Sequence, residues 1–392
     1  MRSRALKLPA AILLLLFILP GVFSAGAATA PAAIVKPIEL VRQSVKLTTG
    51  TKTVNVIKVN PKDPSIRFEV GLPDSRLNMT EDFEKMAGAK GAIAAINANF
   101  ISSYGPVKDP VGHVMIDGKL VYGQSGITSL GITKNKDLVF GTPGIFTRMF
   151  ADGKRTNDMH IGGLAYYNVW TAYEINTRNP AKSNTIMYTP NRGASIEIKA
   201  PGYVATVRNK VLQSFVKLNP PQTVSIPKDG YVTFFGSNVV SSWKGDNGLS
   251  KGRNIETEYY LFKSKDASYK LDEMQWMLSG APDLVTNGKI STAKLPPGFT
   301  DSRFTTVSAY RTAIGVKKDG LLLLVSAKNV RISELKEIML KLGCVNAINL
   351  DGGASSGMYY DGKVITMPGR KLATLLYVYR DNPITELNRS SP

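Results

Sequence analysis

The sequence predicts an α+β protein: a strand-rich single domain of mixed sheets with a few short helices, including a βαβ unit near the C-terminus. Three observations support this class. The 392 residues contain 35 glycines and 22 prolines, which divide the chain with turns. Short apolar runs of strand length recur between these turns. Hydrophobic residues make up 43% of the chain and charged residues 20%, which is typical of a globular domain.

Residues 1–30 have the pattern of a secretory signal peptide. Three basic residues among the first seven precede an apolar stretch, Ala10–Val22, and small residues follow at 24–28. This stretch is short for a transmembrane helix, and no later segment is apolar for long enough to span a bilayer. We therefore expect a secreted protein, extracellular or associated with a cell wall, with an uncleaved anchor as the alternative. Residues 31–49 are expected to form an exposed lead-in.

The folded domain is expected to cover residues 50–380, and 381–392 a frayed tail. Thr80 has the position of an N-cap and predicts a short helix. The apolar residues at 92–96 then predict a buried strand that ends in Asn97-Ala98-Asn99. Tyrosines and turns dominate 150–260, where we expect a small subdomain.

The clearest predicted unit lies at 311–363. Two apolar strands joined by a turn at Asp319-Gly320 precede a helix, for which Ser333 is the expected N-cap. Another apolar strand, 345–350, follows this helix. A strand–helix–strand crossover normally makes parallel neighbours in one sheet. Asp351 is therefore expected just beyond the end of an interior strand, where ligands bind in open α/β sheets.

The formal net charge of the chain is +19, and removal of the three basic residues in the signal peptide leaves +16. This excess favours an anionic neighbourhood, such as a phosphate-bearing wall polymer or a lipid surface. A solvated basic surface without a specific partner fits equally well. The basic residues are scattered, without zinc-finger spacing or a basic helix, so we expect no nucleic-acid partner. A single cysteine, Cys344, excludes an intramolecular disulfide.

The stretch Asp351-Gly352-Gly353-Ala354-Ser355-Ser356 is the first candidate site. The two glycines permit a close approach of the backbone to a ligand, and consecutive N–H groups can bind an anion. Ser355 and Ser356 add hydroxyl groups, and Asp351 adds one carboxylate. A plain Asp-Gly turn is the alternative, and Asp361-Gly362 is expected to be one.

Three further stretches could contribute to a site. Arg311 enters an apolar strand, where its charge needs a partner, and a guanidinium fits phosphate or carboxylate; an edge salt bridge is the alternative. Asn97 and Asn99 could bind sugar hydroxyls or form Asx turns. Gly280 lies in a glycine turn before a strand.

Several established catalytic motifs are absent from the sequence. It contains no HExxH, no Walker loop and no GxGxxG after a strand. His113 and His160 lack metal-ligand spacing, and His113 is expected to be structural. We therefore expect no metal site and no cofactor.

Several motifs together resemble the phosphodiester glycosidases, the family of the mannose 6-phosphate uncovering enzyme. Arg311–Gly315 is similar to the family's Arg-Thr-Ala-Ile-Gly stretch, and NLDGGASS to its Asn-Leu-Asp-Gly-Gly-Gly-Ser-Ser stretch. AINANF and LSGAPDLVTNGK are similar to two glycine-rich stretches, with Ala98, Asn99 and Ala281 in glycine positions. INTRNPAKSNTIMYTPNRG and IPKDGYV also resemble family segments, so the similarity extends over about 50–380.

This resemblance implies hydrolysis of the glycosidic C1–O bond of a sugar-1-phosphodiester in wall or exopolysaccharide material. Arg311 would bind the phosphate, and Asp351 would act as nucleophile or base. The remaining implied binding residues are Asn97, Asn99, Gly280, Gly352, Gly353, Ser355 and Ser356, with Arg178 as a second cation and Glu174 as a second carboxylate.

Two other functions stay open on the sequence. A protein of the same fold could bind a glycan or a cell wall without catalysis, since fold does not establish activity. A phosphodiesterase would break the P–O bond instead, although a two-metal site would need more histidines than the two in this chain.

Overall fold

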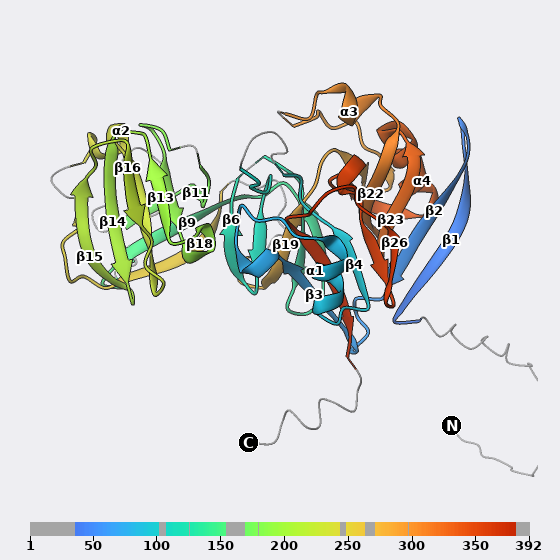
Figure 1. The fold of residues 1–392 in the computed structure, drawn as a ribbon, viewed down its shortest axis with the longest axis horizontal. Helices are drawn as coiled ribbons and strands as arrows, with labels where there is room; N and C mark the ends of the chain where they lie inside the picture. Colours follow the sequence, from blue (N-terminus) through green and yellow to red (C-terminus); the bar gives the residue numbers. More distant parts are fainter. Residues whose placement is uncertain are drawn as a thin grey trace, which may run out of the picture. The chain divides into compact units, whose positions relative to one another are not determined.

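The computed structural model describes residues 36–101, 107–124, 126–153, 169–178, 180–243, 248–262, 271–296 and 298–381 (Figure 1). The expected signal peptide and 382–392 of the expected tail lie outside these residues. The described chain is rich in strands arranged in several sheets, with few helices, as predicted. Within this described part, no helix has the length and apolar character needed to cross a membrane.

The largest sheet has seven strands and carries the predicted C-terminal unit. In spatial order its strands are β1 (Ile38–Leu47), β2 (Gly50–Val59), β23 (Leu322–Val330), β22 (Ala309–Lys317), β24 (Cys344–Asn349), β20 (Asp283–Thr286) and β21 (Lys289–Ile290). Every neighbouring pair in this sheet is antiparallel. The lead-in expected at 31–49 is wrong for 38–47, because β1 pairs with β2 along its whole length.

The strand–helix–strand segment differs from the expected βαβ unit. Helix α4 (Ile332–Lys341) connects β23 to β24, but both strands pair with β22, which lies between them. The two strands run in the same direction without being neighbours, so the prediction of parallel neighbours is wrong. β22 and β23 form a hairpin. Helix α4 then carries the chain across β22, so that β24 pairs with the other edge of β22.

Both faces of the central strands of this sheet are buried, which explains why these strands are apolar. Along β23, Leu322 and Leu324 belong to one core cluster, whereas Leu323 and Val325 belong to another. The second cluster includes the apolar face of α4, made by Leu335, Ile338 and Met339. Successive side chains of a strand point to opposite faces, so this alternation matches the period of two.

Two predicted helix starts are displaced. Helix α4 begins at Ile332 instead of after Ser333, and the Glu334 carboxylate accepts a hydrogen bond from the N–H of Arg331 (2.8 Å). Helix α1 (Phe83–Ala89) has Asp82 and not Thr80 as its N-cap residue. The remaining short helices are η1 (Pro73–Ser75), η2 (Pro190–Arg192), α2 (Ser237–Val240), α3 (Ser302–Thr305) and η3 (Gly353–Ser355).

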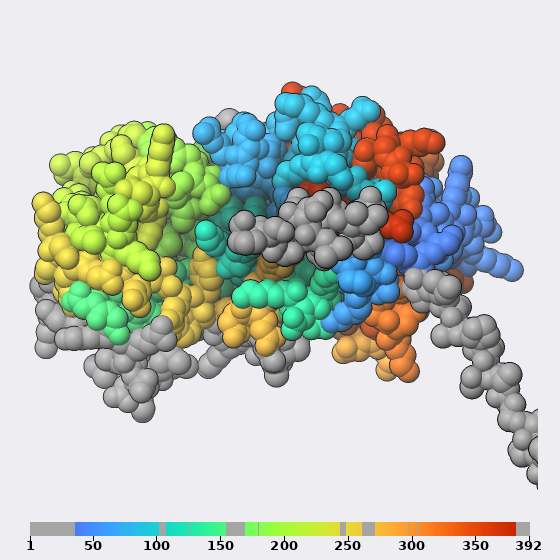
Figure 2. Space-filling model, turned by 90° about the horizontal axis from the view of Figure 1, so that it is seen from below, coloured from blue at the N-terminus to red at the C-terminus, as the bar shows by residue number. Residues whose placement is uncertain are grey.

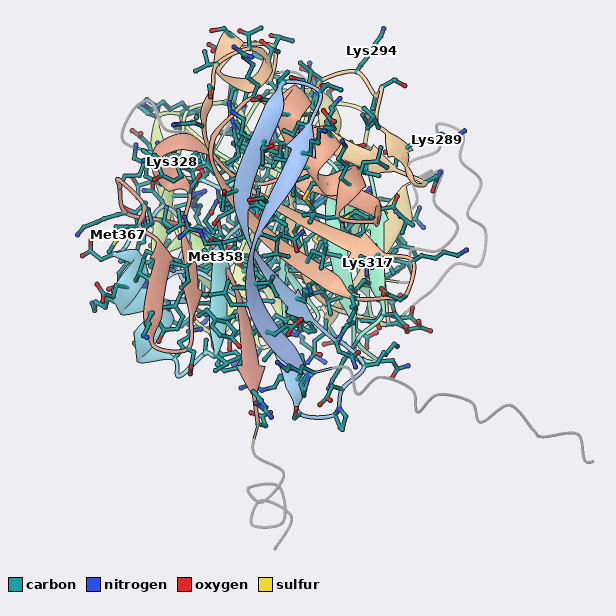
Figure 3. All side chains as sticks on the ribbon, turned by 90° about the vertical axis from the view of Figure 1, so that its right-hand side faces the viewer. Lys289, Lys294, Lys317, Lys328, Met358 and Met367 are labelled. Atoms are coloured by element: carbon teal, nitrogen blue, oxygen red, sulfur yellow. The ribbon has the colours of Figure 1, made fainter. Side chains whose placement is uncertain are left out.

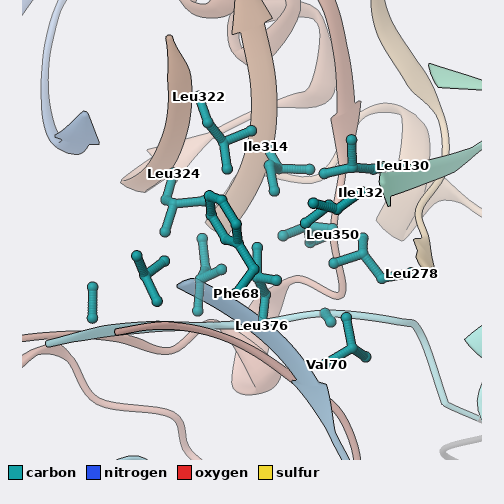
Figure 4. Packing of buried hydrophobic residues seen from close by; sticks show 14 of the residues in the cluster. Phe68, Val70, Leu130, Ile132, Leu278, Ile314, Leu322, Leu324, Leu350 and Leu376 are labelled. Carbon is teal, nitrogen blue, oxygen red and sulfur yellow. The ribbon is translucent and has the colours of Figure 1, made fainter. Parts of the chain in front are cut away.

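Two five-stranded sheets contribute to the core beneath the large sheet. One has the order β26 (Lys363–Thr366), β25 (Met358–Tyr360), β4 (Ala94–Asn97), β27 (Leu375–Arg380) and β3 (Ile66–Gly71). The other has the order β6 (Lys119–Tyr122), β5 (Val114–Ile116), β19 (Met274–Ser279), β7 (Ser129–Thr133) and β8 (Leu138–Gly141). Figure 4 shows Phe68 and Leu376 packed near Leu324 and Ile314, within one cluster drawn from all three sheets.

Strands from 144–262 form three more sheets, in the region where a small subdomain is expected. They are β11 (Glu174–Ile175), β12 (Thr185–Tyr188), β17 (Gly230–Gly236), β14 (Gly202–Arg208) and β15 (Val211–Lys217); β10 (Val169–Ala172), β9 (Gly144–Ala151) and β18 (Ile255–Phe262); and β13 (Ser195–Ile198) with β16 (Gln222–Ser225). Part of this region has its own core around Tyr188 and Phe234. Met115 and Met277 join a second core with residues of this region, so the two parts share packing. Figure 2 shows these residues in green to yellow.

Exposed lysines project from the large sheet and its neighbouring loops. Lys289, Lys294 and Lys328 are exposed, and Lys317 is half-buried (Figure 3). They lie on different elements, which agrees with the scattered distribution of basic residues in the sequence.

Substitution Gly315→Ala is expected to destabilise the fold. A Cβ at this position of β22 would lie 2.7 Å from Cys344 Sγ, 2.8 Å from Met339 Cε and 3.0 Å from Ala347 Cβ. Overpacking of this kind costs about 1–3 kcal/mol. Urea denaturation should show a lower midpoint with an unchanged slope.

Gly88→Ala is the matched control. It lies in helix α1 with no atom within 4 Å of a new Cβ, so alanine should stabilise the protein by up to about 1 kcal/mol. Equal effects of the two substitutions would contradict close packing between β22 and α4.

Candidate active site

The site begins where β4 and β24 end and β22 starts. Asp351 follows β24, which lies inside the seven-stranded sheet, as predicted from the apolar run before it. The main chain of Asp351 is held on both sides: its N–H donates to Ala98 O (3.1 Å), and its carbonyl accepts from Asn97 Nδ2 (2.6 Å) and Thr312 Oγ1 (3.1 Å). The carboxylate therefore projects from a firmly anchored backbone.

The Asp351 carboxylate is buried, with only 7% of the residue exposed. Arg370 Nη2 donates to its Oδ2 (3.2 Å), and Arg370 Nε donates to Ser355 Oγ (2.6 Å). Burial raises the pKa of Asp351 to about 6, although hydrogen bonding by Ser355 and the charge of Arg370 oppose that rise. Near neutral pH this group changes between a proton donor and an anionic base.

Arg311 brings a second guanidinium to the same place. It lies on β22 and is 3% exposed, and its Nη2 donates to Val307 O (2.8 Å). Burial lowers the pKa of Arg311 from its usual range, and the nearby charge of Asp351 acts in the opposite direction. A Cβ on Gly352 would lie 3.1 Å from Arg311 Nη1, so glycine at 352 leaves room for the guanidinium.

These charged groups line one pocket of about 410 Å³. The loop after β24 forms its floor with Gly352, Gly353 and Ala354. Gly353 has a φ of 62°, in the left-handed region that glycine tolerates, and it begins the single turn η3. Among the described residues, the lining consists of Phe100, Ile101, Phe304, Val307, Ala309, Arg311, Asp351, Gly352, Gly353, Ala354 and Arg370.

Ser355 and Ser356 are buried and do not line this pocket. Ser355 instead orients Arg370 through the hydrogen bond at its Oγ. The Ser356 hydroxyl has no hydrogen-bond partner among the described residues. Ser355 therefore contributes to the site indirectly, because it positions Arg370.

Asn97, through both polar atoms of its amide, and Asn99, through its Nδ2, form hydrogen bonds inside the protein. Besides its bond to Asp351, Asn97 accepts at Oδ1 from Thr312 Oγ1 (2.9 Å) and from the N–H of Gly357 (3.0 Å). Asn99 Nδ2 donates to the carbonyls of Val111 and His113, both at 3.0 Å. Asn97 thus joins strand ends beneath the pocket, and neither amide lines the pocket.

Gly280 lies where two backbones meet closely. A Cβ here would be 2.4 Å from the carbonyl oxygen of Asn349, and Asn349 Nδ2 donates to Ala281 O (2.7 Å). Glycine at 280 permits this approach to the end of β24. The residue does not line the pocket.

Glu174 and Arg178 lie elsewhere, on and just after β11, and Arg178 contacts Asp109. Arg192 pairs with Asp109 through both of its terminal nitrogens, and Arg178 Nε lies 3.5 Å from Asp109 Oδ2. Glu174 accepts hydrogen bonds from Thr177 Oγ1 (2.5 Å) and Asn184 Nδ2 (3.2 Å). Neither Glu174 nor Arg178 lines the pocket of Asp351.

Sequence reasoning missed Arg370 and the apolar side of the pocket. Arg370 follows the Pro368-Gly369 turn, and only the folding of that loop brings it to Asp351. The turn itself was a visible signal, but a basic residue after a turn is too common to indicate a site. His113, expected to be structural, is fully buried with Nε2 3.0 Å from Pro143 O, and burial lowers its pKa to about 4.

The fold is similar to that of solved structures. A hypothetical protein from Synechocystis superposes with a TM-score of 0.72 at 20% identity, covering 90% of this chain and 64% of that one. A protein from Burkholderia pseudomallei with a provisional description as exported gives a TM-score of 0.63 at 19% identity, covering 85% and 74%. At these identities the similarity concerns the fold alone.

Sequence comparison supplies the family. Residues 192–379 match the family model described as phosphodiester glycosidase. This segment contains Arg311, Asp351 and Arg370, and its match confirms the resemblance found in the sequence.

Two curated relatives have similar but short matches. The human N-acetylglucosamine-1-phosphodiester alpha-N-acetylglucosaminidase is 34% identical over 106 residues, which is 24% of this chain and 21% of the human protein. The Bos taurus protein of the same name is 31% identical over 106 residues, covering 24% and 20%. The chain thus spans about a fifth of the length of these relatives.

Asp351→Asn is expected to change how stability depends on pH. Because the folded-state pKa of about 6 lies above the usual value of 3.8, folding favours the protonated acid, and this contribution is lost as pH rises through 6. The free energy of unfolding of Asp351→Asn, relative to that of wild type, should therefore rise by up to about 3 kcal/mol between pH 4 and pH 8.

Chemical denaturation at both pH values measures this difference. Asp361→Asn, in the exposed turn ten residues further on, is the control and should show no such pH-dependent gain. A constant difference between Asp351→Asn and wild type at both pH values would contradict a raised pKa of the buried carboxyl.

Proposed function

We propose that this chain is a secreted hydrolase that cleaves the glycosidic C1–O bond of sugar-1-phosphodiesters. The observation that carries the proposal is the convergence of Arg311, Arg370 and the buried Asp351 carboxylate on one pocket. The match of 192–379 to the phosphodiester glycosidase family model supports the reaction class.

The charge of the pocket suits a phosphodiester. Two guanidinium groups and one ionised carboxylate leave one positive charge, which balances the single negative charge of a phosphodiester. Guanidinium groups also match the planar, bidentate geometry of phosphate oxygens. The backbone of Gly352 and Gly353 adds close polar contacts on the pocket floor.

In the proposed reaction, Asp351 acts at the anomeric centre, either as nucleophile or as the base that activates water. The C1–O bond breaks, its electron pair leaves with the phosphate monoester, and the oxygen of water ends on C1. Since a phosphate monoester is a good leaving group, Arg311 and Arg370 need only stabilise its charge, and strong proton donation is unnecessary.

The natural substrate is proposed to be a phosphate-linked glycan of a cell wall or other extracellular material. The signal-peptide pattern at 1–30 supports export, and the positive charge of the chain supports an anionic polymer as its neighbour. Asn97 and Gly280 are proposed to maintain the pocket, because their contacts lie within the protein.

Loss of activity is expected in two variants tested on a synthetic sugar-1-phosphodiester. Asp351→Asn removes the base or nucleophile and should lower kcat/KM by about 10²–10⁴-fold. Arg311→Lys keeps the charge but loses the bidentate donor and should cost about 10²-fold. Release of reducing sugar measures both effects, and Asp361→Asn should retain wild-type activity.

Hydrolysis in oxygen-18 water identifies the bond that breaks. Label in the C1 hydroxyl of the sugar supports the proposed glycosidase, whereas label in the phosphate would indicate a phosphodiesterase. Tight glycan binding without any release of sugar would indicate the non-catalytic alternative.

We expect kcat/KM to increase as the pH rises through about 6, which gives the pH profile an acid limb there. The limb follows ionisation of Asp351 in the free enzyme, whose pKa is raised to about 6. Arg370→Gln should move the limb to higher pH, because the positive charge of Arg370 favours the ionised form of the carboxyl.

Lys371→Gln is the control for Arg370→Gln. It removes the neighbouring positive charge, which is mainly exposed and pairs with Asp82 and not with Asp351. It should leave the limb in place. Identical limbs for Arg370→Gln and wild type would contradict coupling between Arg370 and the titrating group.

A further inference from the structure

We propose that the pocket is selective for sugar-1-phosphodiesters whose alcohol arm is apolar, that is, an alkyl or aryl group without hydroxyls. This inference rests on the proposed function and specifies its substrate class: the glycan is linked through its 1-phosphate to an apolar alcohol and not to a second sugar. It follows from the uneven distribution of polar and apolar side chains around the pocket.

The side chains of the lining form a charged group and an apolar group. Arg311, Asp351 and Arg370 are the charged members. The apolar members, which we call the apolar wall, are Phe100, Ile101, Phe304, Val307 and Ala309. A phosphate held by the two guanidinium groups would place one of its two ester arms against this wall.

The apolar wall is a packed structure. The rings of Phe100 and Phe304 meet edge to face, with centroids 5.5 Å apart, and both contact the buried Phe299, at 4.9 and 5.1 Å. These rings belong to a small core cluster that also contains Ala281. The wall is therefore preformed, and a ligand need not order it on binding.

The wall begins directly beside the phosphate-binding cation. The carbonyl of Val307 accepts a hydrogen bond from Arg311 Nη2 (2.8 Å), while the Val307 side chain lines the pocket. Val307 is 43% exposed, so the apolar wall continues from the pocket to the solvent-exposed surface. An alcohol arm longer than the pocket could extend along this surface.

The chemistry of the wall selects against a glycosyl alcohol arm. Its five side chains offer no hydrogen-bond donor or acceptor, so sugar hydroxyls placed against them would lose water without gaining a partner. An alkyl or aryl group gains from the same contact. The sugar arm would instead face Arg370 and the polar backbone of Gly352–Ala354.

Selectivity can be tested with diesters that share one sugar 1-phosphate and differ only in the alcohol. Octyl, benzyl and mannosyl esters of N-acetylglucosamine 1-phosphate and of glucose 1-phosphate are suitable. We expect kcat/KM to be at least about tenfold higher for the octyl or benzyl ester than for the mannosyl ester. Preference for octyl over benzyl would indicate a lipid-like alcohol, and the reverse preference a small aromatic alcohol.

Val307→Ser tests whether the apolar wall causes the selectivity. Because Val307 is partly exposed, this variant should fold, and it should lower the octyl-to-mannosyl ratio of kcat/KM about tenfold. Val216→Ser is the matched control: Val216 is 48% exposed on β15, away from the pocket lining, and its substitution should leave the ratio unchanged.

The outcomes separate this inference from the proposed function. Equal hydrolysis of mannosyl and octyl esters would overturn the inference and leave the glycosidase activity standing. Absence of hydrolysis of every ester would overturn the proposed function, and the inference with it. An unchanged ratio in Val307→Ser would also overturn the inference, since the selectivity would then arise elsewhere.

Discussion

The amide of Asn97 joins three strand ends that come from distant parts of the chain. Through its two polar atoms it bonds to the Asp351 carbonyl, the Thr312 hydroxyl and the Gly357 N–H. All of these groups are buried, so loss of any partner would leave polar atoms without hydrogen bonds in the interior. The position of the Asp351 carboxylate, and with it the geometry of the pocket, depends on this junction.

Around that junction the protein holds the Arg311 guanidinium and the Asp351 carboxylate out of water, with the half-buried Arg370 beside them. Such burial is unfavourable unless each charge has hydrogen-bond partners. Main-chain carbonyls accept hydrogen bonds from Arg311, and Ser355 and Asp351 accept hydrogen bonds from Arg370. The raised pKa of Asp351 shows that burial still outweighs these contacts for the carboxyl. A bound phosphodiester would place its negatively charged oxygens next to the N–H donors of the two guanidinium groups.

Local pattern was sufficient for part of this structure and insufficient for the rest. Strands buried on both faces were visible as apolar runs, and Asp351 could be placed beyond one of them because its run ends abruptly. Strand order was not visible: nothing in the local sequence indicates that β22 lies between β23 and β24.

The candidate site shows the same division. Arg311 was recognisable because an arginine in an apolar strand needs a partner, whereas Arg370 reaches Asp351 only through the path of a loop. For Asn97, the residue type allowed either a sugar contact or an internal bond, and its three-dimensional neighbours decide between them. Glu174 and Arg178 rest on resemblance alone. In the structure Arg178 contacts Asp109 and Glu174 bonds to Thr177, and neither lines the pocket.

The segment recognised by sequence similarity is not a self-sufficient folding unit. Within 192–379, strand β23 would lose its partner β2, and β25 and β27 would lose β4 from between them. A truncated recombinant fragment of this segment would expose unpaired strand edges that favour aggregation. The segment that is similar in sequence is thus shorter than the unit that the sheets require. The N-terminal strands are a structural requirement for the residues within the matched segment.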